Sequence, residues 1–152
     1  MRTVCDTRKT WEPVVVSLLA SDGSAHSLKA LNEAIKIAKG LQTKLIVLHV
    51  YWGEEGAVNI DPKEIPAEDV DIEALKMVRK LDKIMKDRRV EYELRSERSS
   101  DVPKAITEYA ESVNCEMIII GNKGVGGVRG FLLGSVAEKV VSTSRRSVLI
   151  VK

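Results

Sequence analysis

Five short apolar runs, which alternate with longer stretches of helical periodicity, constrain the fold of this chain most strongly. The runs at 14–20, 44–51 and 117–120 are almost continuously aliphatic or β-branched, as expected for strands buried on both faces of a parallel sheet. The run at 90–96 alternates apolar and polar residues, which is typical of an edge or half-exposed strand, and a last run covers 147–151. Strands of this kind need helices to cover both faces of the sheet.

Stretches with apolar residues at helical spacing lie between these runs and predict four helices. They are expected between Ser24 as N-cap and Gly40, over 69–86, after Ser100 or Asp101 as N-cap, and over 135–142. The resulting order, β-α-β-α-β-α-β-loop-α-β, predicts an α/β fold. We expect a single open, doubly wound, five-stranded parallel sheet of Rossmann-like type with helices on both faces.

The composition is that of one globular domain. With 152 residues, 44% of them hydrophobic and 30% charged, we expect a single domain over 14–152 after a polar N-terminal tail at 1–13. Lys and Arg outnumber Asp and Glu by only 24 to 22, which gives no general reason to bind nucleic acid or an anionic membrane. The longest apolar run is too short to span a bilayer.

The two cysteines indicate a reducing compartment. Cys5 and Cys115 are too few and too far apart for a disulfide framework, so a cytoplasmic location is expected. Cys115 lies just before an apolar run and is predicted to be a small buried side chain. His49 lies within an apolar strand and is predicted to be a core histidine with a hydrogen-bond partner rather than a catalyst.

Two loops with unusual chemistry follow the carboxyl ends of strongly buried strands. One is 20–24, with the sequence ASDGS, and the other begins with GNKG at 121–124. Ligands of open doubly wound sheets bind beyond the carboxyl ends of the strands, where the strand order reverses. If the first and fourth strands flank that reversal, the two loops face each other across one cleft.

The second loop has the composition of a phosphate-binding segment. Six of the fifteen residues from Gly121 to Ser135 are glycine, which lets backbone N–H groups approach an anion. Gly134-Ser135 falls at the start of a helix, whose free N–H groups favour phosphate, and Ser135 could either cap that helix or donate its hydroxyl. Lys123 and Arg129 add positive charge nearby.

The glycine spacing differs from the two common phosphate motifs. No Gly-Lys-Ser/Thr ending completes a Walker A loop, and the dinucleotide pattern that begins at Gly124 has Arg129 in place of its last glycine. The spacing present is G-x2-G-x9-G-S, between the apolar strand MIIIG and the helix that begins GSVAEKV. This pattern resembles the ATP-binding branch of the universal stress protein family. The segment SDGSAHSLKALNEAIKIA and the strand LIVLHV resemble the same family, so the resemblance covers 14–152.

The resemblance implies an adenine nucleotide, ATP or alternatively ADP or AMP, with Mg or Mn at the phosphates. The residues implied in binding are Ala20, Ser21, Asp22 and Val50 beside the base and ribose, Ile120, Gly121 and Gly124 near the ribose and first phosphate, and Gly134, Ser135 and Val136 along the phosphates. Family members commonly form homodimers through the last strand, here Ser147 to Val151. Three positions depart from the family: Lys123 replaces a frequent His, Ala137 an occasional hydroxyl, and Arg146-Ser147 a frequent Pro.

Three functions are compatible with these features. The first is a nucleotide-dependent regulator of the stress response, in which ATP orders 52–67 or the glycine-rich loop and changes the binding of a protein partner. The second is a slow metal-dependent ATPase or phosphotransferase, although no catalytic or metal-ligating residue is predicted and Ser135 lacks the pattern of a triad. The third is a dimeric scaffold without nucleotide. Asp22 is expected to cap the first helix, to contact the ligand, or both.

Overall fold

The computed structural model describes residues 16–54, 71–126 and 133–152. Along these residues the elements are β1 (Val16–Ala20), α1 (Ala25–Leu41), β2 (Lys44–Trp52), α2 (Ile72–Met85), β3 (Tyr92–Ser99), α3 (Val102–Ser112), β4 (Met117–Gly121), α4 (Ser135–Thr143) and β5 (Ser147–Val151). Strands and helices alternate as predicted, and the α/β fold class is confirmed.

All strand pairs are parallel, and the sheet has the order β3-β2-β1-β4-β5. The central strand β1 pairs on one side with β2, where Ala20 lies opposite Leu48, and on the other with β4, where Ala20 lies opposite Ile120. The strand order therefore reverses between β1 and β4. This confirms that the first and fourth strands flank the reversal, and it brings the loops after them to the same edge of the sheet.

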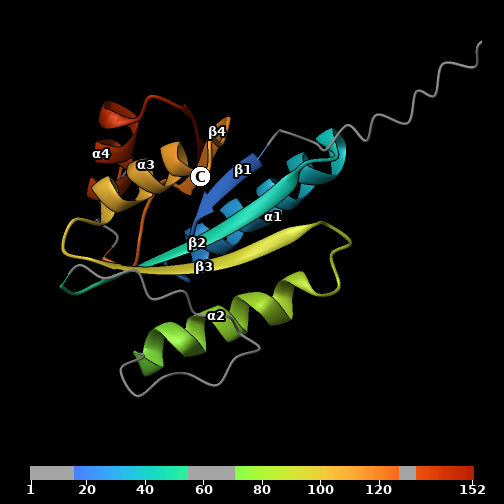
Figure 1. Ribbon diagram of the computed structural model, residues 1–152, viewed down its shortest axis with the longest axis horizontal. Helices are drawn as coiled ribbons and strands as arrows, with labels where there is room; N and C mark the ends of the chain where they lie inside the picture. Colours follow the sequence, from blue (N-terminus) through green and yellow to red (C-terminus); the bar gives the residue numbers. More distant parts are fainter. Residues whose placement is uncertain (1–15, 55–70, 127–132) are drawn as a thin grey trace, which may run out of the picture.

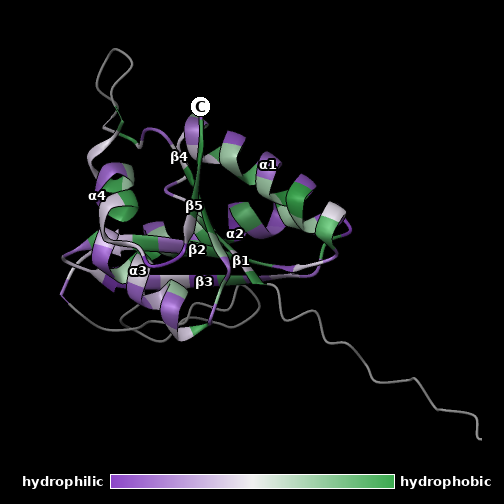
Figure 2. Cartoon of the chain, turned by 90° about the horizontal axis from the view of Figure 1, so that it is seen from above, coloured by the Kyte–Doolittle hydropathy of each residue, from purple (hydrophilic) through white to green (hydrophobic). Residues whose placement is uncertain are grey.

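Each face of the sheet carries its own hydrophobic core. Leu19, Val47 and Ile119 pack with α1 and α2 on one face, whereas the neighbouring Leu18 packs with α3 and α4 on the other. Leu18 and Leu19 are both fully buried, which explains why the central strands lack an apolar–polar alternation. Figure 1 shows α3 and α4 together on one side of the sheet and α2 beside β3 on the other. In Figure 2 the helices carry hydrophilic residues on one side and hydrophobic residues on the other.

The starts of α1, α3 and α4 agree with the sequence prediction, whereas α2 begins at Ile72 after Asp71 as N-cap rather than at 69, and not every helix end agrees. The Ser24 hydroxyl accepts a hydrogen bond from the Ser27 N–H at 3.2 Å and caps α1, as predicted, and the Asp101 carboxylate rather than Ser100 caps α3. Gly40 lies inside α1, and the left-handed residue that ends the helix is Gln42, with φ of 52°. Gln42 closes the helix because its N–H donates to two carbonyls of the last turn.

The edge strand β3 extends further than its apolar pattern predicts. It continues to Ser99 because it pairs with β2 as far as Trp52, so tertiary pairing rather than hydropathy sets its end. Its half-exposed character is confirmed.

Several predictions concern residues outside the described ranges. These are the N-terminal tail with Cys5, the residues 55–67 of the long connection, and Arg129. No helix among the described residues is long and apolar enough to cross a membrane. Cys115 is a buried free thiol, as predicted, and burial raises its pKa.

Candidate functional site

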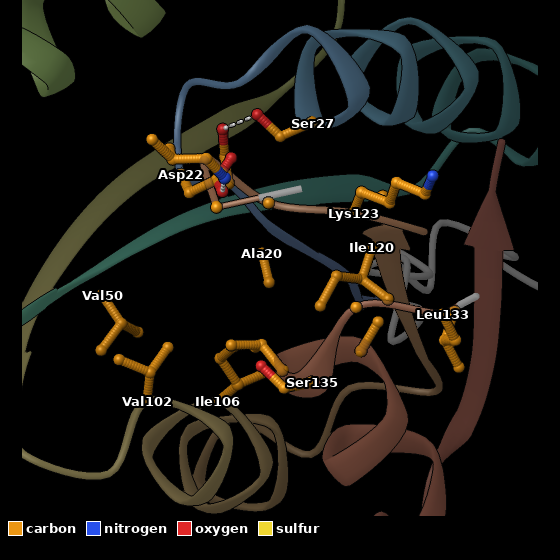
Figure 3. A pocket seen from close by; sticks show the side chains of 18 of the residues that line it. Ala20, Asp22, Ser27, Val50, Val102, Ile106, Ile120, Lys123, Leu133 and Ser135 are labelled. Carbon is orange, nitrogen blue, oxygen red and sulfur yellow. Dashed lines mark hydrogen bonds between the residues drawn. The ribbon is translucent and has the colours of Figure 1, made fainter. Parts of the chain in front are cut away.

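A cavity of about 300 Å³ lies at the carboxyl ends of β1, β2 and β4, between the sheet and helices α3 and α4 (Figure 3). Its lining includes all eleven residues that the sequence singled out: Ala20, Ser21, Asp22, Val50, Ile120, Gly121, Lys123, Gly124, Gly134, Ser135 and Val136. The volume is at the lower end of the range for small-molecule sites. The topology thus brings together two loops that are separated by most of the chain.

One part of the cavity is apolar. Val50 at the end of β2 lies opposite Val102 and Ile106 of α3, and Ala20 and Ile120 form the floor from the two central strands (Figure 3). Val102 and Ile106 are one helical turn apart, so both point to the same side of α3. Walls of branched aliphatic side chains on either side suit a flat, uncharged ring.

The other part presents the N-terminus of α4. The N-cap is Gly134, which has no side chain to bond the first turn, and its own N–H donates to the Asn122 carbonyl at 2.7 Å. Ser135 is the first helical residue rather than the cap, which rules out one of its two predicted roles. Within the described residues, the N–H groups of Ser135 and Val136 have no acceptor, and neither does the Ser135 hydroxyl. Free N–H groups at the positive end of a helix favour an anion.

Two glycines of the motif are closely packed within the protein, and at Gly121 no Cβ fits without a shift of the backbone. A Cβ at Gly121 would lie 2.9 Å from the backbone carbon of His26, at the start of α1. A Cβ at Gly134 would lie 3.2 Å from the Asn122 carbonyl oxygen. These glycines therefore let the glycine-rich loop pack closely on α1 and on itself, in addition to any role toward a ligand.

Buried hydroxyls and a histidine fix the loop after β1. The hydroxyls of Ser21 and Ser27 lie 3.2 Å apart, and both residues are buried (Figure 3). His49 bonds the Ser21 carbonyl through Nδ1 at 2.9 Å. Because a carbonyl only accepts, this nitrogen carries the proton. His49 is therefore a core histidine with a partner, as predicted, and Tyr51 stacks on it.

Asp22 connects the two loops and does not cap α1. Its Oδ1 accepts a hydrogen bond from the Ser24 N–H and its Oδ2 one from the Val125 N–H, both at 2.9 Å. Partial burial of Asp22 raises its pKa, but the hydrogen bonds from Ser24 and Val125 outweigh that effect, so the pKa lies below its usual value. The carboxylate is therefore ionised at neutral pH. Asp22 and Lys123 are the two titratable side chains among the described lining residues.

The sequence matches that of the universal stress protein family over residues 17–152. The chain belongs to this family. It is 31% identical to universal stress protein YxiE of Bacillus subtilis over 145 residues, covering 89% of this chain and 97% of that protein. The structure is similar to that of a universal stress protein in complex with cAMP, with 27% identity, a TM-score of 0.67 and coverage of 90% and 95% of the two chains. The Archaeoglobus fulgidus universal stress protein in complex with dAMP shares the fold, with 23% identity, a TM-score of 0.68 and coverage of 91% and 98%.

Sequence reasoning missed four lining residues of this universal stress protein, which are Ser27, Leu48, Val102 and Ile106. Four more lie in or just after the predicted phosphate-binding segment but were not named as binding residues: Val125, Gly126, Leu133 and Ala137. Val102 and Ile106 were visible only as the apolar stripe of a helix, and the hydrophobic pattern alone does not distinguish a cavity wall from a core. The aromatic residues at the end of β2 do not contribute to the lining: Trp52 is 80% exposed, and neither it nor Tyr51 lines the cavity.

Metal-binding groups are not concentrated at the cavity. No cluster of three or more His, Cys, Asp or Glu side chains in the described ranges could hold a metal ion. Among the described lining residues, Asp22 alone offers a carboxylate to a divalent cation.

Proposed function

We propose that this universal stress protein binds an adenine nucleotide in the cavity and acts as a nucleotide-dependent regulator. One observation carries the proposal: the cavity at the strand-order reversal combines apolar walls of aliphatic side chains with the N-terminus of α4, where the N-cap Gly134 has no side chain to bond the first turn. The apolar walls suit a base, and the helix terminus suits a phosphate. Structures of similar universal stress proteins in complex with cAMP and dAMP support the same class of ligand.

We assign the two ends of the ligand to the two parts of the cavity. The base would lie between Val50 and α3, beside the loop that contains Ala20, Ser21 and Asp22. The ribose and first phosphate would follow Ile120, Gly121 and Gly124. The phosphates would accept N–H groups from Ser135 and Val136 after Gly134, with Lys123 contributing positive charge.

We propose that this chain belongs to the ATP-binding branch of the family and binds ATP, with ADP and AMP as the alternatives. The free N–H groups of the first turn of α4 provide donors for more than one phosphate oxygen. We propose that Mg²⁺ or Mn²⁺ enters together with the phosphates. Asp22 is the one carboxylate of the described lining, and because its oxygens already accept two backbone hydrogen bonds, it is not enough to hold a cation before the nucleotide binds.

Binding is favoured over rapid catalysis. Phosphoryl transfer needs an oriented nucleophile and a group that accepts its proton. The Asp22 oxygens already accept N–H groups, and its lowered pKa makes it a weak base. We therefore propose that any ATP hydrolysis is slow.

We propose that the protein is a cytoplasmic homodimer that pairs through β5. This strand is at one edge of the sheet, and its four apolar side chains, Val148 to Val151, are only half-buried. Such an edge is a template for pairing with a second strand. The cytoplasmic assignment rests on the cysteine content.

Mass spectrometry of small molecules released from freshly purified protein tests the ligand class directly. We expect an adenine nucleotide. Equilibrium dialysis with ATP, ADP, AMP and adenosine, and with GTP as the control, would then rank the ligands. Protein that carries no nucleotide and binds none of the adenine compounds would contradict the proposal and favour the scaffold without nucleotide.

A further inference from the structure

The Asp22 carboxylate forms a bridge between the two loops that line the cavity. It accepts hydrogen bonds from the N–H groups of Ser24 and Val125, and the second of these residues is 103 positions from Asp22 in the sequence. Ser24 belongs to the loop after β1, and Val125 to the glycine-rich loop after β4. Val125 is 80% exposed, so its N–H would face water without this partner.

Gly124 is explained by the same bridge. A Cβ at this position would lie 2.6 Å from Asp22 Oδ2, and among the described residues the only other atom within 4 Å would be Asp22 Cγ. At Gly126, two residues further along the same loop, a Cβ would meet no atom of the described residues within 4 Å. Within the part of the chain that the structure describes, the Asp22 carboxylate is therefore what limits the space around Gly124.

The charge of Asp22 restricts what it can do for a phosphate. Hydrogen bonds from Ser24 and Val125 keep the carboxylate ionised despite partial burial. An ionised carboxylate has no proton to donate and repels a phosphate at close range. Without a cation between the two groups, a favourable effect of Asp22 on phosphate binding therefore acts through the backbone that it holds.

We propose that Asp22 is a positioning residue that fastens the glycine-rich loop to the loop after β1, so that affinity for the phosphates depends on a side chain that does not contact them. This inference rests on the proposed nucleotide site. It separates two roles of Asp22, because contact with the ribose would affect adenosine and ATP alike, whereas loop positioning affects the phosphorylated ligands.

A double-mutant cycle with Gly124→Ala and Asp22→Ala tests the bridge. In the wild-type background the added methyl group displaces the carboxylate from the Val125 N–H. We expect Gly124→Ala to weaken ATP binding about tenfold, roughly the effect of one charge-assisted hydrogen bond, and to weaken adenosine binding much less. In the Asp22→Ala background the methyl group has space, so the same substitution should have no further effect on ATP affinity. Gly126→Ala, the matched substitution in the same loop, should weaken ATP binding less than Gly124→Ala does.

A loss from Gly124→Ala that persists in the Asp22→Ala background would overturn the inference, because the methyl group would then be colliding with the ligand itself. Equal losses for adenosine and ATP would also overturn it.

Hydrogen exchange of the Val125 amide in the ligand-free protein provides a readout that needs no nucleotide. We expect exchange to accelerate in both Asp22→Ala and Gly124→Ala and to stay slow in Gly126→Ala. Unchanged exchange in Asp22→Ala would refute the bridge without touching the proposed function. Conversely, a wild-type protein that binds no adenine compound would refute the proposed function and the effect on phosphate affinity, even if Val125 exchange responds as expected.

Discussion

At Ser135, one substitution can distinguish stabilisation of helix α4 from binding of a phosphate. It is the first residue of α4, it is exposed, and it follows a glycine cap that leaves the first turn without a side-chain acceptor. A negative charge at this position favours the helix, because it lies at the positive end of the dipole, but it repels a bound phosphate.

We expect Ser135→Asp to lower ATP affinity by about tenfold or more without lowering the thermal stability of the protein. Adenosine affinity should change little, because the substitution lies at the phosphate end of the cavity. Dialysis and thermal unfolding measure the two effects, and Ser135→Ala is the control for loss of the hydroxyl alone. ATP affinity equal to that of the wild type would show that phosphates do not bind at this helix end.

At the scale of elements, a polar contact holds α2 against the edge strand β3. The Tyr92 hydroxyl donates to Asp82 at 2.8 Å, and Asp82 also pairs with Lys86 at 2.8 Å although it is 7% exposed. Burial, together with the hydrogen bond to Asp82 and the negative charge of that residue, raises the pKa of Tyr92 to about 12.

This contact should give the protein a measurable alkaline transition. The folded state raises the pKa of Tyr92, so its contribution is complete below the unfolded value near 10 and is lost as the pH rises toward 12. Tyr92→Phe should lower the free energy of unfolding by about 1 kcal/mol at pH 8. The difference between the two proteins in denaturant titrations should shrink between pH 10 and 12. A difference that stays constant over that interval would contradict the assignment.

The elements themselves were largely predictable, because burial on both faces produces continuous apolar strands such as that around Leu18 and Leu19. The order of the strands was not predictable from the sequence, which indicated only that the two loops would meet if the first and fourth strands were neighbours. The structure pairs β1 with β4. The eleven residues converge on one cavity because parallel strands end at the same edge. The contacts of Asp22 and the wall from α3 were not predictable, since they depend on how loops and helices distant in sequence meet. The end of α1 at Gln42 likewise depends on two carbonyls of the folded helix.

At the scale of the whole molecule, β5 is the edge strand through which we propose that two copies pair. Ile150→Lys would place a charge on this half-buried edge, and two such charges would face each other across a symmetric pair. We expect the variant to elute as a monomer in size-exclusion chromatography with light scattering, while the wild type elutes as a dimer. Ile150 does not line the cavity, so ATP affinity should be retained. A folded variant that remains dimeric would contradict pairing through β5.

The pairing of β1 with β4 also has a consequence for biosynthesis. The first loop of the site is made early, but its counterpart follows only after α3 and β4, and the helix N-terminus later still. A nascent chain that has completed β3 therefore contains the loop after β1 but not the glycine-rich loop after β4. If the ligand binds only the finished domain, it stabilises that domain in proportion to its concentration, and the cellular nucleotide level would then influence how much of the newly made protein survives quality control.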